Sequence, residues 1–165
     1  MKIARISKAC VAFGLALFAF VAVFNNITDF DTNFAFVNHV LRMDTTAPDN
    51  PLMYRAVTNE SLLHAVFFGI IAIELAVGLS FFSGAVSLWR ARHASPIAFA
   101  QARQWIYVGA MLAFLLWYVG FLVVAGEWFL MRQSKSWNTM ESAFRTHVAM
   151  FLALIYISQS EPHQP

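Results

Sequence analysis

Four long apolar stretches, separated by polar segments, dominate the pattern of hydrophobic and polar positions. They cover about residues 6–24, 62–88, 105–129 and 140–158. A helix needs roughly 20 residues to cross a hydrocarbon core of about 30 Å, and the first three stretches meet that length. The fourth is strictly apolar only over 148–157 and spans if its helix extends back to residue 140. The pattern predicts an all-α polytopic membrane protein, a four-transmembrane-helix bundle that forms a single membrane domain over residues 1–165.

The connection between the first two stretches, residues 25–61, is longer than a hairpin of two helices requires. Its apolar positions recur at helical spacing over about 32–43, which predicts a short amphipathic helix at the membrane interface. Thr32 is the predicted cap of this helix, and a turn-forming cluster at 48–51 follows it. We interpret the helix as a cover over the outer ends of the four spanning helices. A part in substrate binding is the alternative.

Charge along the chain predicts the orientation in the membrane. Basic residues, without any acidic residue among them, precede the first stretch and fill the connection between the second and third: Lys2, Arg5, Lys8, Arg90, Arg92 and Arg103. Because such basic segments stay in the cytoplasm, both termini are predicted to be cytoplasmic and residues 25–61 to lie outside. The first stretch resembles a signal peptide but ends without a small-x-small pair, so it is predicted to be an uncleaved anchor.

Composition agrees with a membrane protein and excludes other classes. Hydrophobic residues make up 59% of the chain and charged residues 12%, against about 25% charged residues in an ordinary soluble domain. The net charge of +2 is small and the basic residues are dispersed, so no nucleic-acid partner is predicted. The sequence has no glycine-rich phosphate loop. The lipid bilayer is the expected surrounding, and the single cysteine, Cys10, is expected to be a buried thiol.

Glu74 is the clearest candidate for a functional residue, because it lies near the middle of the second apolar stretch. A carboxylate at that depth is costly unless it is protonated, hydrogen-bonded or paired. Tyr118 lies at matched depth in the third stretch, so one hypothesis is a neutral carboxyl group bonded to the Tyr118 hydroxyl. The other is a proton or cation relay through Glu74. Gly78, one turn later, is predicted to leave space beside the carboxyl group.

A ridge of small residues runs along another face of the second stretch. It consists of Ala72, Ala76, Ser80 and Gly84. Small side chains at every fourth position let helix backbones approach closely in lipid. The ridge therefore predicts a packing contact, with another helix of this chain or of a neighbouring protein.

A second group of candidate residues gathers at the outer ends of the helices once the predicted topology is applied. It comprises Asp29, His39, Asp44, His64, Glu127, Trp128 and His147. His64, His147 and Glu127 fall at similar depth, where two imidazoles and a carboxylate could bind a divalent metal and two facing histidines a haem. These residues lack the close spacing of a metal motif. No cofactor is therefore predicted, and a haem or divalent metal at this group is the alternative.

A long outer segment over residues 33–46, with shorter segments at 25–29, 126–129, 133–134 and 137–138, is distinctive. Together these segments resemble a bacterial family of predicted small integral membrane proteins without assigned function, domain of unknown function 2165. The resemblance implies a four-helix protein of the inner (cytoplasmic) membrane of a Gram-negative bacterium, with acids similar to Glu74 and Glu127. Ile73 departs from the family, where an aromatic residue is expected. The resembling outer segments are expected to lie close together.

Three functions follow from these features as hypotheses. The leading one is a non-catalytic accessory subunit that binds another membrane protein. The second is a transporter or channel in which several copies assemble around Glu74 as a proton or cation site. The third is a membrane redox subunit with haem or metal at the outer group of residues. The expected partner is another membrane protein or a second copy in a homo-oligomer, and an enzymatic role is disfavoured.

Overall fold

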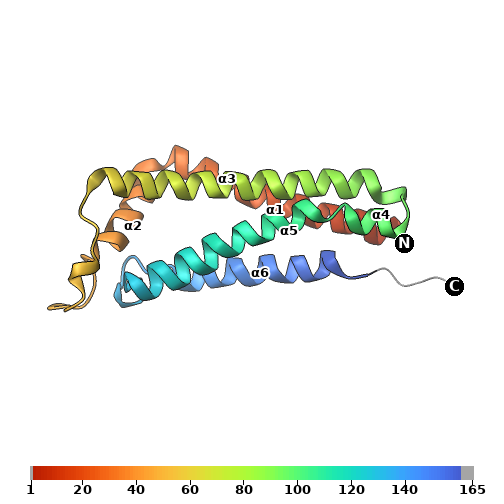
Figure 1. Cartoon of the computed structure of the whole chain (residues 1–165). Helices are drawn as coiled ribbons and strands as arrows, with labels where there is room; N and C mark the ends of the chain where they lie inside the picture. The colour runs from red at the N-terminus through yellow and green to blue at the C-terminus, as the bar shows by residue number, and fades with distance from the viewer. Residues whose placement is uncertain (1, 161–165) are drawn as a thin grey trace.

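Helices form almost all of the protein in the computed structural model, which describes residues 2–160 (Figure 1). In chain order the elements are α1 (Lys2–Thr28), α2 (Phe30–Arg42), η1 (Met53–Arg55), α3 (Glu60–Arg90), η2 (Ala91–His93), α4 (Pro96–Gln101), α5 (Gln104–Ala113), η3 (Phe114–Trp128), η4 (Met131–Gln133) and α6 (Met140–Ser158). Within the described range there is no strand. The all-α prediction is confirmed.

Four segments are long and apolar enough to cross a membrane. They are Lys2–Thr28, Glu60–His93, Pro96–Trp128 and Met140–Ser158. They pack as a bundle in which α1 lies along α3 and η3 lies along α6 (Figure 1). The predicted four-helix membrane bundle is confirmed. The last helix extends back to Met140, which supplies the length that its short apolar part lacks.

The two ends of the bundle carry different structures. The beginning of α1 and the end of α6 lie at one end, here called the termini end (Figure 1). Helix α2, η1 and residues 129–139 lie at the opposite end, here called the α2 end (Figure 1). At the termini end the Lys8 ammonium donates to the Gln159 carbonyl (2.5 Å) and the Arg103 guanidinium to the Ser158 carbonyl (2.9 Å). These bonds satisfy carbonyls that the end of α6 leaves without helical partners.

Helix α1 approaches α3 closely because it presents a stripe of alanines. Four of its buried residues recur at helical spacing: Ala9, Ala12, Ala16 and Ala19. Such small side chains allow close contact between helix backbones in lipid. Cys10 lies beside the stripe and is exposed, so the prediction of a buried thiol is wrong. On α3, Ser80 and Gly84 of the predicted ridge are buried, whereas Ala72 is exposed.

The third membrane segment changes its winding along its length. Ser95 caps the short α4 by accepting a hydrogen bond from the Ala98 N–H, and Pro96 stands in the first turn. Beyond α5, η3 is a π-helix, in which N–H groups bond to carbonyls five residues earlier. The Phe129 N–H continues this pattern to the Val124 carbonyl at 3.0 Å. Side chains on η3 therefore point in other directions than an α-helical pattern predicts.

Helix α2 forms within the first connection, where the amphipathic pattern predicted a helix. It begins at Phe30, and Asp29 occupies the capping position without a side-chain bond, so the prediction of Thr32 as the cap is wrong. Met43 ends the helix in a left-handed conformation with φ of 56°. Its buried residues are Val37, Val40 and Leu41. They belong to a cluster shared with residues of α3 and of the segment after η3, so α2 is part of the bundle wall at this end.

Candidate functional site

Glu74 is the only acidic side chain that is buried within residues 2–160. Its exposed fraction is 5%. At 1.5 Å of rise per residue, it lies about 20 Å or more from either end of α3. It therefore occupies the middle of the second membrane segment, surrounded by protein.

The partner of Glu74 is Asn26, near the end of α1. Asn26 Nδ2 donates a hydrogen bond to Glu74 Oε2 at 2.7 Å. The second oxygen, Oε1, accepts no hydrogen bond from any residue in the described range. It is not fully enclosed, because part of its surface remains accessible. One carboxyl oxygen is therefore fixed, and the other remains open to the adjoining space.

Asn26 takes the place that the sequence assigned to Tyr118, so the prediction of a bond between Glu74 and Tyr118 is wrong. Tyr118 stacks on Phe114 (5.0 Å between ring centres) and lies against His147 of α6 (5.1 Å). The third segment diverges from α3 towards α6 (Figure 1), and its π-winding moves Tyr118 off the expected face. The preceding residue, Trp117, is buried and faces the space beside Glu74.

The prediction that Gly78 leaves space beside Glu74 is also wrong. A β-carbon at Gly78 would lie 2.7 Å from Phe20 Cε1, so the Phe20 ring of α1 packs directly on the glycine. Val77 and Phe81 have no exposed surface. Packed side chains of α1 and α3 therefore close the side of Glu74 that faces the termini end.

A cavity of about 430 Å³ with a mixed polar and apolar lining, here called the Glu74 cavity, lies on the side of Glu74 that faces the α2 end. Its hydroxyl and amide side chains are Asn26, Thr32, Asn33, Ser136, Thr139, Ser142 and Thr146. The exposed residues Thr32, Ser136 and Ser142 form its rim. The buried residues Glu74 and Trp117 lie at its inner part. This volume is sufficient for several water molecules or a small solute.

Glu74 is the only charged residue among the described residues that line this cavity. The same lining includes no lysine, arginine or histidine, so no cationic side chain in it neutralises the carboxyl group. Hydroxyl and amide groups both donate and accept hydrogen bonds, and they can solvate water or a polar ligand. The cavity therefore favours a cation or a neutral polar molecule over an anion.

Analysis of the sequence missed the polar wall of the Glu74 cavity. Thr139, Ser142 and Thr146 recur at spacings of three and four residues around the start of α6, which places them on one helix face. That spacing is visible in the sequence. Asn26 could also have been found there, as the second of two asparagines that follow the first apolar stretch. Trp117 has no comparable signal, because its direction depends on the winding of η3.

A second cavity, of about 290 Å³, lies between α2, α3 and η3 and is lined by apolar residues. Phe36 of α2 and Phe121 of η3 line both this cavity and the Glu74 cavity. Their rings stack with centres 6.2 Å apart and planes inclined by 11°. This aromatic pair forms a wall that the two cavities share. The Glu74 cavity lies on one side of the ring stack and the apolar cavity on the other.

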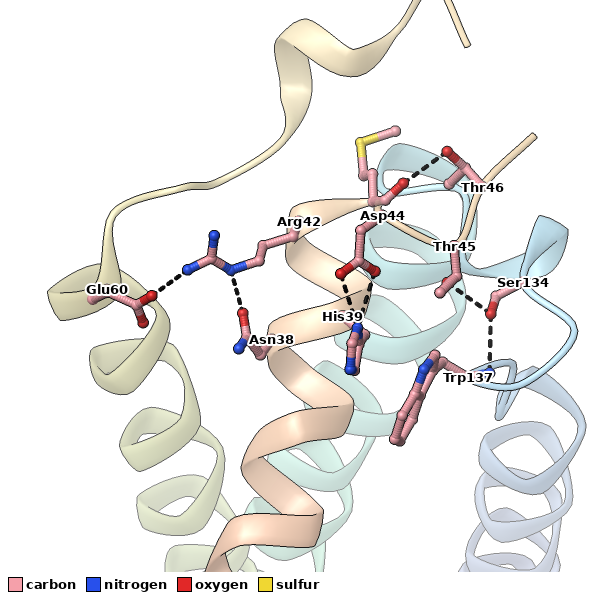
Figure 2. Close-up of polar contacts among 10 residues, drawn as sticks. Asn38, His39, Arg42, Asp44, Thr45, Thr46, Glu60, Ser134 and Trp137 are labelled. Carbon is pink, nitrogen blue, oxygen red and sulfur yellow. Dashed lines mark hydrogen bonds and ion pairs between the residues drawn. The ribbon is translucent and has the colours of Figure 1, made fainter. Parts of the chain in front are cut away.

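Polar contacts attach α2 to the start of α3 (Figure 2). The Arg42 guanidinium pairs with the Glu60 carboxylate and also donates to Asn38 Oδ1 at 2.5 Å. Figure 2 shows Arg42 reaching from α2 across to the first turn of α3. The ion pair is exposed on the Glu60 side, so it contributes modestly to stability.

Further contacts attach α2 to the segment before α6 (Figure 2). The Asp44 carboxylate pairs with His39 Nδ1 at 2.8 Å, and the His39 ring stacks on Trp137 with centres 4.7 Å apart. The Thr45 hydroxyl donates to the Ser134 hydroxyl at 2.8 Å. Because Trp137 also lines the Glu74 cavity, these contacts position part of its wall.

Other members of the predicted outer group lie in separate surroundings. His64 stacks on Phe34 of α2 (4.2 Å), and His147 lies among rings of η3 and α6. Glu127 pairs with Arg132 at 3.0 Å. Within residues 2–160, no group of three or more His, Cys, Asp or Glu side chains is placed to hold a metal ion. The structure does not bring the metal candidates together, because each belongs to a different helix and contacts different neighbours.

The last two members of that group are on the surface. Asp29 is exposed, and its carbonyl accepts a hydrogen bond from Asn33 Nδ2 at 2.8 Å. Trp128 is exposed, and the Arg55 guanidinium lies 4.4 Å from its ring centre. Trp128 therefore joins the end of η3 to the loop that precedes α3.

The distinctive outer segments meet at the α2 end, which confirms the expectation that they lie close together. Their contacts are the His39–Trp137 stack and the Thr45–Ser134 bond described above. Comparisons with curated proteins and with solved structures find no match. Residues 4–160 match the family described as "Predicted small integral membrane protein (DUF2165)". This match covers nearly the whole sequence, and the chain therefore belongs to that family of small integral membrane proteins.

Proposed function

We propose that this integral membrane protein is a transport protein that binds a proton or another small cation at Glu74, with access from the α2 end. The supporting observation is the carboxyl group itself, which is buried at the middle of α3 with one oxygen held by Asn26 and the other open to the Glu74 cavity. An acid at this depth is costly. A bundle that only had to pack would gain from an apolar residue at this position.

The residues around Glu74 have complementary roles in this proposal. Asn26 orients the carboxyl group by holding Oε2, so that Oε1 is available to the incoming cation. Hydroxyl groups at Thr32, Ser142 and Thr146 offer oxygen atoms along the cavity wall. A cation that leaves bulk water can therefore exchange part of its hydration for these groups before it reaches the carboxylate.

Release towards the termini end requires a second conformation. Phe20 on Gly78 and the buried side chains of Val77 and Phe81 close that side. A single four-helix bundle of this size has little room for a continuous pathway. We therefore include a homo-oligomer in the proposal, in which neighbouring copies move relative to one another.

Flux into vesicles that contain the purified protein tests this function. The substitution Glu74→Gln keeps the size of the side chain and can still accept a hydrogen bond from Asn26, but it removes the acid. We expect flux of protons or monovalent cations to fall to the level of empty vesicles, while the amount of protein in the membrane stays unchanged. Dyes sensitive to pH and to cations report the flux.

Glu60→Gln is the matched control. It makes the same chemical change on the same helix, at an exposed residue outside the Glu74 cavity, and we expect it to retain flux. The proposal is wrong if the wild-type protein gives no flux above that of empty vesicles. It is also wrong if Glu74→Gln transports as well as the wild-type protein.

We also propose that the α2 end is the outer face of a bacterial inner membrane and that both termini are cytoplasmic. The basic residues Arg5, Lys8 and Arg103 all lie at the termini end, and basic segments stay in the cytoplasm. Fusion of the C-terminus to a reporter that is active only in the cytoplasm should give a signal. A signal only from a reporter that is active in the periplasm would contradict this orientation.

A surface at the α2 end supports the accessory subunit as a second proposal. Tyr54 is 75% exposed, and the Arg55 guanidinium lies 5.6 Å from the centre of its ring and 4.4 Å from that of the Trp128 ring. Tyrosine, arginine and tryptophan are the residues that contribute most to protein interfaces. This group could bind the outer part of another membrane protein.

Co-purification tests the accessory role. We expect a tagged protein, extracted in mild detergent, to retain a stoichiometric membrane partner that the double variant Tyr54→Ala, Trp128→Ala loses. Quantitative mass spectrometry against an untagged control measures the partner. Recovery of the protein alone as a homo-oligomer would contradict the accessory role and agree with transport.

A further inference from the structure

The wall of the Glu74 cavity combines its single carboxylate with aromatic rings. The rings belong to Phe36, Trp117, Phe121 and Trp137. Phe67 also borders the cavity, but it is only 1% exposed. The first four come from α2, η3 and the segment before α6, so aromatic side chains border the cavity from several elements. Figure 2 shows the Trp137 ring beside His39, at the level where α2 meets the segment before α6.

Two of these rings are held in place by contacts outside the cavity. Trp117 is 7% exposed and lies against Phe18 of α1, with ring centres 5.9 Å apart. Trp137 stacks on His39, whose Nδ1 is hydrogen-bonded to the Asp44 carboxylate. The two indoles are therefore positioned before any ligand arrives, which reduces the entropy lost on binding.

This combination suits one class of cation better than others. Aromatic faces attract organic ammonium ions, which spread their charge over an apolar surface, and a nearby carboxylate adds a full opposite charge. Calcium and magnesium instead need six or more oxygen ligands, with carboxylates prominent among them. Glu74 is the only carboxylate among the described lining residues. The lining therefore fits an organic cation and offers too few charged oxygens for a bare divalent metal.

We infer that the cavity binds a small organic ammonium ion, with its charged nitrogen beside Glu74 and its alkyl groups against the aromatic rings of the wall. This inference rests on the proposed function and narrows its cation to a chemical class. The cavity volume of about 430 Å³ is within the usual range for small-molecule sites. The ammonium group belongs to a free amine or to the headgroup of a membrane lipid.

Choline is a suitable probe, because a neutral compound of nearly the same shape exists. In 3,3-dimethylbutan-1-ol a carbon atom replaces the charged nitrogen. The full-length protein is placed in nanodiscs of phosphatidylglycerol, a lipid without an amine headgroup, and each compound is titrated by calorimetry. We expect saturable binding of choline and binding of the alcohol that is weaker by about tenfold or more, because the alcohol lacks the charge.

Two variants connect this binding to the cavity. We expect Glu74→Gln to weaken choline binding by about tenfold and Trp137→Leu, at the side of the cavity, to weaken it severalfold. Each variant should change the affinity for the neutral alcohol less than it changes the affinity for choline. Trp105→Leu is the matched control for the second variant, because Trp105 is exposed and lies outside the cavity. It should bind choline as the wild-type protein does.

Equal affinity for choline and the alcohol would overturn the inference, as would the absence of saturable choline binding. Choline binding that neither Glu74→Gln nor Trp137→Leu alters would also overturn it. These results differ from a failure of the proposed function. If proton or cation flux depends on Glu74 but choline does not bind, only the ammonium ligand is refuted. If the protein shows neither flux nor choline binding, the ammonium ligand and the transport function are both refuted.

Nanodiscs that contain phosphatidylethanolamine identify the source of the ammonium group. If a lipid headgroup occupies the cavity, this lipid competes and lowers the apparent affinity for choline. If the ligand is a free amine, the affinity is the same in both kinds of nanodisc. Either result agrees with an ammonium ligand and assigns its origin.

Discussion

The two halves of α3 pack in different ways. Towards the termini end, small residues bring helices into close contact: the alanines of α1 lie along α3, and Gly84 contacts Ile106 of α5. Towards the α2 end, the neighbours of α3 are a separate short helix and the π-helix η3, and two cavities lie between them. Glu74 stands where one kind of packing changes to the other.

This difference separates a scaffold from a site. Close packing of small side chains favours a rigid arrangement, and the pocket that α1 and α3 line in this half contains no acidic side chain. The large aromatic side chains and helix α2 fill the α2 end less completely than small residues fill the termini end. The Glu74 cavity therefore remains beside the buried acid. We expect substitutions in the half of α3 towards the termini end to change stability, and substitutions in the half towards the α2 end to change ligand binding.

The largest effect on stability should come from a substitution at Gly84 of α3, with Gly69 of the same helix as the matched control. A β-carbon at Gly84 would lie 2.2 Å from Ile106 Cδ1 and 3.1 Å from the Ile106 backbone nitrogen, whereas nothing lies within 4 Å at Gly69. We expect Gly84→Val to lower the free energy of unfolding by about 2–3 kcal/mol and Gly69→Val to change it by less than about 0.5 kcal/mol. Unfolding in detergent micelles measures both. Equal losses would show that the two halves pack alike.

A smaller effect is expected at the boundary between the halves, from the bond between Asn26 and Glu74. A double-mutant cycle of Asn26→Ala and Glu74→Ala should give a coupling energy of about 1 kcal/mol, as for other hydrogen bonds between membrane helices. Asn25→Ala is the control, because Asn25 is exposed and Asn26 is the residue that donates the hydrogen bond to Glu74. Coupling as large with Asn25 as with Asn26 would contradict the specific pair.

The smallest effect should come from the ion pair at the rim of the α2 end. Arg42→Gln is expected to lower the free energy of unfolding by less than about 1 kcal/mol, because Glu60 is largely exposed and water screens the pair. The loss should shrink in high salt. Arg145→Gln, in the more exposed pair with Glu141, should change stability even less. A loss at Arg42 comparable to that at Gly84 would mean that α2 is as tightly integrated as α5.

Much of the fold could be predicted from the sequence, and less of the site. The spanning segments and the buried position of Glu74 follow from the length of the apolar stretches, which is a local property. The partner of Glu74 is not local. Asn26 lies 48 residues away along the chain, and Tyr118 was the wrong choice because the third segment diverges from α3 and changes its winding.

The sequence by itself therefore determined the class of protein, the helical elements and the presence of one acid within the membrane. Hydrophobic length and period decide these features without reference to distant residues. The tertiary structure alone decided that Asn26 holds Glu74, that Trp117 rather than Tyr118 faces the cavity, and that His64, His147 and Glu127 lie apart. Which side chains meet depends on how helices cross and wind, and that depends on packing between segments far apart in the chain.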